Sequence, residues 1–157
     1  MRKLIKYSFL VFVYLIFFVQ TIKADIVKPN NSINPFEVVK IQLAGLKKND
    51  YPFKDAGIEQ TWEFAHPNNQ RSTGPLEKFK MMLKGDSFSM LINHDSHKVQ
   101  EVWLSDDVAT FEVIVLGNDK KYYGFKWQVE KFIGNGPLKG CWLTTAVSLP
   151  MSLGSAI

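Results

Sequence analysis

The spacing of apolar residues changes near residue 86, and this change constrains the fold more than any other feature of the chain. Up to Leu83, apolar side chains recur three or four residues apart, as they do on one face of an α-helix. From Phe88 onward they recur two residues apart, as they do on one face of a β-strand. Helices followed by strands predict an α+β fold in which the helices cover one face of a sheet.

We expect three N-terminal helices, over residues 35–48, 58–66 and 75–84. The first has a complete start signal, because Asn34 can accept amide hydrogens, Pro35 suits the first helical position and Glu37 can reach back. Gln42 lies off the apolar stripe of this helix. Pro67 ends the second helix, and the residues that follow it, 68–72, are expected to form a polar loop.

The second half predicts about five strands, over residues 88–93, 99–104, 108–116, 121–132 and 141–147. The turns between them are short, so neighbouring strands are antiparallel. Tyr123, Phe125 and Trp127 share one face of their strand with Val129, which gives the sheet one apolar side. Such a sheet curls as it packs on helices, and it then encloses a cone that is either filled or left open as a pocket.

Residues 1–24 have the features of a secretory signal peptide, because basic residues precede an unbroken apolar run over residues 9–19 and the segment ends at Ala24. We expect an entry segment over 25–34, a single α+β domain over 35–148 and a C-terminal tail over 149–157. The predicted location is the secretory pathway, with the protein secreted or lumenal. Alternatives are plastid import through a signal plus a transit segment, and a signal anchor that stays uncleaved, which would be the one contact with a membrane. Asn30, in the sequon Asn30-Asn31-Ser32, is the glycosylation candidate.

The net charge of +4 belongs to this leader and not to the domain. The leader holds four basic residues and no acidic one, and the other 15 basic residues balance the 15 acidic ones. A neutral domain does not indicate a nucleic-acid partner. Cys141 is the sole cysteine, so no intrachain disulfide forms, and its apolar neighbours predict that it is buried.

The stretch from Trp62 to Leu83 carries a recognisable pattern, WEFAHP followed by Asn69 and by TGPLEKF. It resembles the domain-of-unknown-function 4864 family, in versions associated with plants and algae, over about residues 36–147. That resemblance implies the nuclear-transport-factor-2-like (cystatin-like) fold, an α+β cone, but no activity. His66 departs from the pattern, where a small residue such as serine is expected. The positions that carry the family motif are Phe64, Ala65, Pro67, Asn69, Thr73, Gly74, Pro75 and Phe79.

No motif in the chain specifies a reaction. The run from His94 to His97 offers two imidazoles and a carboxylate, but a metal site needs three or four converging ligands, so we interpret it as a solvated hairpin. We expect no metal and no cofactor. His66 is interpreted as a helix cap, satisfying carbonyls at the end of the second helix, rather than as a general base.

A lyase or isomerase would need an acid or base inside the cone that faces a hydrogen-bond donor. No two of the suitable residue types are seen to converge, so no catalytic residue is assigned. The suitable types are Tyr122, Tyr123, Asp107, Glu112 and His66, of which Glu112 is expected on the wet surface.

The aromatic residues supply more rigid apolar surface than a core of this size requires, so they either fill the cone or line a pocket for a small lipid-like or isoprenoid-like ligand. The pocket candidates are Trp62, Trp103, Phe111, Tyr123, Phe125, Trp127 and Trp142. We therefore expect a non-enzymatic domain that binds a small apolar ligand or a protein partner through its cone or sheet face. The alternatives are a lyase or isomerase with an acid/base residue in the cone, and a homodimeric assembly module that pairs through the sheet.

Overall fold

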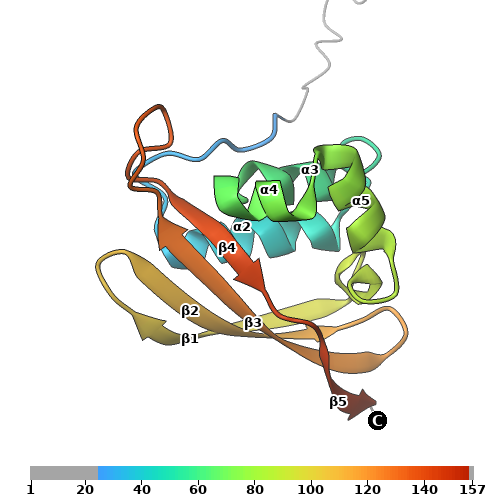
Figure 1. The fold of residues 1–157 in the computed structure, drawn as a ribbon. Coiled ribbons are helices and arrows are strands. Elements are labelled where there is room, and N and C mark those ends of the chain that lie inside the picture. The colour runs from blue at the N-terminus through green and yellow to red at the C-terminus, as the bar shows by residue number, and fades with distance from the viewer. Residues whose placement is uncertain (1–24, 156–157) are drawn as a thin grey trace, which may run out of the picture.

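The structure is a computed structural model that describes residues 25–155. The predicted signal peptide therefore lies outside the described residues, as do residues 156 and 157 of the predicted tail. The described part of the chain has an α+β fold with four α-helices and a five-stranded antiparallel sheet. The helices gather on one face of the twisted sheet (Figure 1).

The first helix starts as the sequence predicts, except that the Glu37 side chain accepts from the Lys40 ammonium at 3.0 Å instead of reaching back to the start of the helix. The side chain of Asn34 accepts a hydrogen bond from the backbone N–H of Glu37 at 2.9 Å, and Pro35 occupies the first turn. The buried apolar residues of this helix then face the sheet. The helices are α2 (Pro35–Lys47), α3 (Ala56–Glu63), α4 (Pro67–Thr73) and α5 (Leu76–Lys84).

Helix α4 occupies the segment where a polar loop was expected, so the chain has four helices here rather than three. Its start is formed by two residues that follow α3: His66 Nδ1 accepts from the N–H of Asn68 at 3.1 Å, and Pro67 is the first helical residue. Gly74 ends the helix at φ +85°, a conformation that favours glycine. His66 therefore caps the start of α4 and not the end of the helix before it.

The strand expected over residues 88–93 is wrong. This segment is a single 3₁₀ turn, η1 (Ser89–Leu91), followed by a loop. Asn93 adopts φ +53°, and its N–H donates to the carbonyl of Leu46 at 2.8 Å. Docking on the last turn of α2 competes successfully with strand formation, because the exposed carbonyls of a helix end require donors.

The sheet has the order β1-β2-β3-β4, and β5 pairs with the other half of β3. Register pairs such as Val113 with Phe125 and Phe111 with Trp127 bring the apolar residues of neighbouring strands to the helix-covered face. Strand β5 lies inside the predicted tail, so residues 151–155 of that tail belong to the sheet. The strands are β1 (Ser96–Leu104), β2 (Val108–Leu116), β3 (Lys121–Lys131), β4 (Trp142–Val147) and β5 (Met151–Ser155).

Two features fix the helical layer. Helices α2 and α3 cross so closely that a Cβ atom on Gly57 would lie 2.2 Å from the carbonyl oxygen of Gly45. The entry segment is bound to the same layer, because the side-chain amide of Gln60 accepts from the N–H of Val27 at 2.7 Å and donates to its carbonyl at 2.9 Å. The helices thus form a closely packed layer on one face of the sheet.

Candidate functional site

A cavity of about 120 Å³ lies between the helices and the sheet, and we call it the interior cavity. Ligand pockets usually measure about 300–1,000 Å³, whereas a cavity of about 150 Å³ holds a benzene ring. The interior cavity is therefore of the size of one small ring. Its lining side chains belong to Gln42, Leu46, Thr61, Ala65, Asn69, Thr73, Phe79, Met82, Leu83, Phe88, Leu91, Trp127, Thr144 and Val147.

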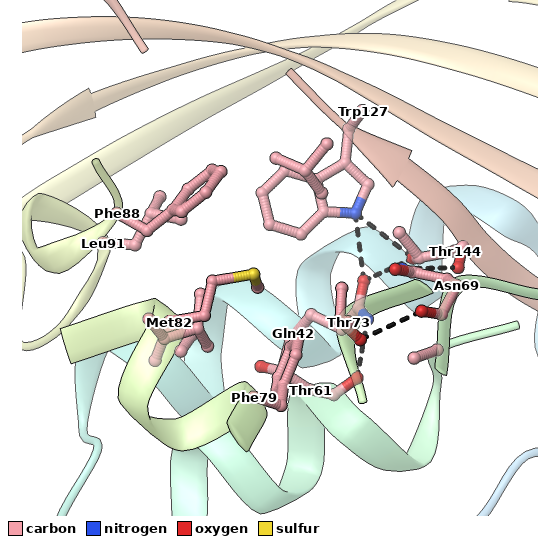
Figure 2. Close-up of a pocket in the computed structure, with 14 residues that line it drawn as sticks. Gln42, Thr61, Asn69, Thr73, Phe79, Met82, Phe88, Leu91, Trp127 and Thr144 are labelled. Atoms are coloured by element: carbon pink, nitrogen blue, oxygen red, sulfur yellow. Dashed lines mark hydrogen bonds between the residues drawn. The ribbon is translucent and has the colours of Figure 1, made fainter. Parts of the chain in front are cut away.

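One end of the interior cavity is formed by a buried hydrogen-bond network centred on Gln42 (Figure 2). The Gln42 side-chain oxygen accepts from Trp127 Nε1 at 3.0 Å and from the Thr144 hydroxyl at 2.7 Å. Its nitrogen donates to the carbonyl of Thr61 at 3.0 Å. Because the indole N–H can only donate and the carbonyl can only accept, this single orientation of the amide satisfies both.

The network holds the indole of Trp127 in place. Trp127 Nε1 also lies 3.2 Å from the Thr144 hydroxyl oxygen, so the three side chains form a closed triangle. Among the described residues, every buried side-chain nitrogen and oxygen atom has a hydrogen-bond partner. A fully satisfied buried network is rigid, because each lost contact would leave an unpaired polar group in a dry environment.

The segment after α3 closes this polar end against β4. The N–H of Thr144 donates to the carbonyl of Phe64 at 2.7 Å, and the carbonyl of Thr144 accepts from the N–H of His66 at 2.8 Å. The side chain of Asn69 donates to the same carbonyl at 3.2 Å. Thr73 follows one helical turn later, and its hydroxyl donates to the carbonyl of Asn69 at 2.9 Å. Helix α4 thereby brings two neutral polar side chains to the cavity.

The opposite end is apolar and comes from α5 and the η1 turn. Phe88, Leu91 and Met82 lie across the cavity from Trp127 (Figure 2). Phe79 forms the wall nearer α3, and its ring packs against Trp62 with 5.0 Å between ring centroids. The interior cavity therefore has a polar end at β4 and α4 and an apolar end at α5 and η1.

None of the 14 side chains that line the interior cavity is ionisable. The five residues considered above as acids, bases or donors for a lyase do not line it either. Glu112 is exposed on the outer face of the sheet, as expected, and Tyr123 donates to the carboxylate of Asp119 at 2.6 Å outside the cavity. The cavity as described offers hydrogen bonds but no group that exchanges a proton near neutral pH.

Of the seven aromatic pocket candidates, Trp127 is the one that lines the interior cavity. Phe111 and Phe125 are buried in the core on the same side of the sheet. Trp62 is half-buried and does not line the cavity, but its ring packs against Phe79, which does. These three aromatic side chains therefore pack in or against the core and do not line the interior cavity.

The other candidates lie apart from the interior cavity. Trp103 is 53% exposed on β1, an edge strand, beside a register shift between Glu101 and Trp103. Trp142 is half-buried, and the Lys131 ammonium lies 5.0 Å from its ring centroid. Tyr123 is held by Asp119, as described above. The structure does not bring these three side chains together.

The family-motif positions lie much closer to the site. Ala65, Asn69, Thr73 and Phe79 all line the interior cavity. Phe64 is fully buried, and the remaining three motif residues, Pro67, Gly74 and Pro75, are placed where α4 begins and ends and where α5 begins. The pattern that carried the resemblance is therefore the pattern that shapes one wall of this cavity.

Gln42, Thr61 and Thr144 were not predicted as site residues. Gln42 was placed off the apolar stripe of α2, yet it is 1% exposed. One signal was available, because Gln42 stands four residues after Val38 and four before Leu46, and both are buried apolar residues on the same helix face. No comparable local signal marks Thr144.

Cys141 and His66 are two further side chains of types that can act as nucleophile or base. Cys141 is buried as expected, its thiol donates to the side-chain oxygen of Asn31 at 3.2 Å, and burial raises the pKa of that thiol above its ordinary value of 9.0. Burial lowers the pKa of His66 below 6.5, although the carboxylate of Glu130 acts in the opposite direction. These groups serve as a packed thiol and a helix cap.

A shallow groove of about 400 Å³ lies on the outer face of the sheet, outside the interior cavity. Leu153 of β5 covers Gly124, and Ile114, Leu149 and Met151 are 40%, 69% and 61% exposed. Charged residues flank the groove, because Glu112 and Lys126 form a cross-strand pair there. This groove is the apolar part of the sheet's outer face.

No known protein family, curated protein or solved structure matches this chain. The resemblance to the domain-of-unknown-function 4864 family therefore stays a prediction. No helix within residues 25–155 combines the length and the apolar character needed to cross a membrane. Over that same part of the chain, no three His, Cys, Asp or Glu side chains come together in a way that could hold a metal ion.

Proposed function

We propose that the protein binds a small, neutral and mostly apolar molecule in the interior cavity, and that it does so without catalysing a reaction. The lining of that cavity is the observation that carries the proposal, because its polar groups are all neutral and gather at one end. An apolar ring would occupy the end formed by Met82, Phe88 and Leu91. One hydroxyl or carbonyl would face Asn69 and Thr73.

The charge and size of the ligand follow from the same lining. An ionised ligand would lose its hydration without gaining an opposite charge, which costs several kcal/mol or more. A cavity of about 120 Å³ accommodates a ring of benzene size and not a long isoprenoid chain. Acid–base catalysis is less well supported than binding, because the lining offers no proton donor or acceptor of suitable pKa.

A titration with three benzene-sized probes tests the proposal. Toluene, phenol and benzoate differ in polarity and charge but hardly in ring size. We expect toluene and phenol to shift the NMR signal of the Trp127 indole N–H, and benzoate at pH 7 to leave it unchanged. Equal binding of benzoate, or no binding of either neutral probe, would contradict the proposal.

A cavity-filling variant locates the binding. Leu91 is 1% exposed and lines the interior cavity, so Leu91→Phe should fill part of it and weaken binding of toluene and phenol. Leu138 is partly buried on the core but does not line the cavity, and Leu138→Phe is the matched control. Equal affinities of the two variants and the original protein would place the probes elsewhere.

The groove on the outer face of the sheet favours a second candidate, a homodimer or a protein partner bound through that face. Its exposed apolar residues, among them Ile114 and Leu153, would be covered by a second copy. Light scattering coupled to size exclusion measures this directly. Leu153→Glu should convert a dimer to a monomer, and a monomeric original protein at high micromolar concentration excludes the homodimer.

We further propose that the protein enters the secretory pathway, as the leader predicts. Asn30 is exposed, and its side-chain oxygen accepts from the N–H of Ser32 at 3.0 Å. Its side-chain nitrogen, which would carry the glycan, makes one long surface hydrogen bond, 3.4 Å to the carbonyl of Lys28. Expression in cells that glycosylate should add a glycan that an endoglycosidase removes and that Asn30→Gln abolishes. Arrival in a plastid without a glycan would support the transit alternative, and retention of the leader in the mature mass would support the signal anchor.

A further inference from the structure

Two histidines that the proposed function does not use are joined directly beneath the η1 turn. His94, in the loop before β1, is 2% exposed, whereas His97 of β1 is half-buried. His94 Nε2 and His97 Nδ1 are 2.7 Å apart, and the two rings meet edge to face with 4.9 Å between centroids. The solvated hairpin expected for this run is therefore wrong, because packing against α2 and η1 buries its first histidine.

The positions of the ring protons follow from the partners. His94 Nδ1 lies 2.8 Å from the carbonyl oxygen of Leu91, and because a carbonyl can only accept, that nitrogen carries a hydrogen. Neutral His94 then has a bare Nε2, which accepts, so His97 Nδ1 must carry the hydrogen of the second bond. Both rings are thus held as Nδ1–H tautomers.

This arrangement limits how many protons the pair can take up. A first added proton goes to His97 Nε2, the one ring nitrogen whose lone pair is free, and both hydrogen bonds persist. A second proton would have to bind His94 Nε2, where it would face the N–H of His97 at 2.7 Å. Two N–H groups cannot share one hydrogen bond, so the second proton requires the rings to separate.

The charges around the pair also oppose protonation. The ammonium of Lys47, in the last turn of α2, acts on both rings, and it lowers the pKa of each together with burial, which is the larger cause. Two influences raise the pKa of His94: first its hydrogen bond to the carbonyl of Leu91, and then the carboxylate of Asp95, which is itself engaged by the ammonium of Lys120 from the β2–β3 turn. Doubly charged, the pair would add two positive charges next to a lysine.

The pair is connected to the interior cavity through one residue. The carbonyl of Leu91 accepts the hydrogen bond from His94, and the side chain of Leu91 lines the cavity. Leu91 also donates its N–H to the carbonyl of Phe88, another lining residue. Movement of His94 toward solvent therefore removes the hydrogen bond that holds this wall.

We propose that His94 and His97 form a pH-dependent latch that holds the η1 wall of the interior cavity in place and releases it when the pair takes up its second proton. The latch itself rests on the geometry of the pair. Its consequence for ligands, release on acidification, rests on the proposed function.

The ring tautomers provide the first test, in the full chain at pH 7.5. Free histidine favours the Nε2–H tautomer, so ¹⁵N-correlated NMR should show His94 and His97 as two exceptions, both Nδ1–H. His66 accepts at Nδ1 from the N–H of Asn68, so it should show the opposite tautomer and serves as the internal reference. An Nε2–H tautomer at His94 or His97 would overturn the proposal.

Hydrogen exchange provides the second test, followed from pH 7.5 to 4.5 as the protection factors of the Leu91 and Ile92 amides. In the latched protein, protection should fall about tenfold per pH unit once the second proton binds, while amides in the middle of α2 keep theirs. His97→Gln can turn its amide to either donate or accept, so the fall should shrink to less than about threefold. The control His66→Asn keeps a helix-capping side chain and should behave as the original protein.

The two proposals can fail separately. If His97→Gln shows the same fall in protection as the original protein, or if Leu91 and Ile92 stay protected down to pH 4.5, the latch is overturned whatever binds in the cavity. If phenol fails to bind at any pH while the protection of Leu91 still depends on His97, the proposed function is overturned and the latch is supported. If phenol binds at pH 7.5 and is released in parallel with the loss of protection, both are supported.

Discussion

Gln42→Leu removes the centre of the buried network while keeping the size of the side chain. The Trp127 indole would keep the Thr144 oxygen at 3.2 Å as a partner, but the Thr61 carbonyl and the Thr144 hydroxyl hydrogen would lose theirs. Each unpaired buried polar group lowers the free energy of unfolding by about 1–3 kcal/mol. Burying leucine in place of the amide raises it by about 1 kcal/mol. We expect the free energy of unfolding to fall by about 1–5 kcal/mol.

Urea unfolding followed by circular dichroism measures this change. Gln70→Leu is the matched control, because Gln70 also donates one side-chain hydrogen bond to a backbone carbonyl, that of Trp62 at 3.1 Å, but lies partly exposed on α4. Its substitution should cost less than about 1 kcal/mol. Equal losses in the two variants, or a loss below about 0.5 kcal/mol for Gln42→Leu, would refute the claim that burial makes this network stabilising.

Three further predictions concern other parts of the chain. Gly57→Ala should destabilise the fold by more than about 2 kcal/mol, because the new Cβ would lie 2.2 Å from the carbonyl oxygen of Gly45. A Cβ on Gly45 would lie 3.3 Å from Cβ and Cγ of Gln60 and 3.4 Å from Cα of Gly57, so Gly45→Ala should cost less than Gly57→Ala; similar urea midpoints would contradict this. Cys141 should react with a disulfide reagent at pH 8 at least about 100-fold more slowly in the folded chain than in the urea-unfolded chain. The reason is that its thiol is buried and that its pKa is raised. Comparable rates would show that the thiol is accessible. Lys84 donates to the carboxylate of Asp55 at 2.7 Å, and this hydrogen bond holds the pKa of Asp55 below 3.8. The stability that the pair contributes is therefore present above pH 3.8 and is lost as the pH falls through the folded-state pKa of Asp55. Lys84→Met should raise the pKa of Asp55 in an NMR titration and cost stability near pH 6 but not near pH 2; an unchanged pKa would mean that the bond is absent in solution.

Features that depend on neighbours along the chain were predictable. The start of α2 was predicted from Asn34, Pro35 and Glu37, because a helix cap is made by residues within one turn of each other. Strand β2 has the predicted bounds and β3 ends within one residue of its own, because alternation of apolar residues needs only the strand itself. The helix class of the first half and the strand class of the second follow from the same local periodicities.

Two errors of prediction came from segments with competing local signals. The polar composition of residues 68–72 suggested a loop, but Pro67 and the imidazole of His66 start a helix there. Residues 88–93 alternate like a strand, yet the positive φ of Asn93 and its bond to Leu46 bind the segment to the end of α2. In both segments one contact outweighed a weak pattern, because short elements gain little stability from propensity alone.

Composition and periodicity were enough to establish an α+β chain with one apolar sheet face and a neutral domain, since these depend on residue type and on spacing of two to four residues. The location and chemistry of the cavity needed the folded chain. Gln42 is buried with its amide satisfied because Thr61, Trp127 and Thr144 meet it from 19, 85 and 102 residues away. The periodicity of α2 places Gln42 on the same face as Val38 and Leu46, but it does not identify these distant partners, because a buried polar contact forms only once packing has excluded water from both sides.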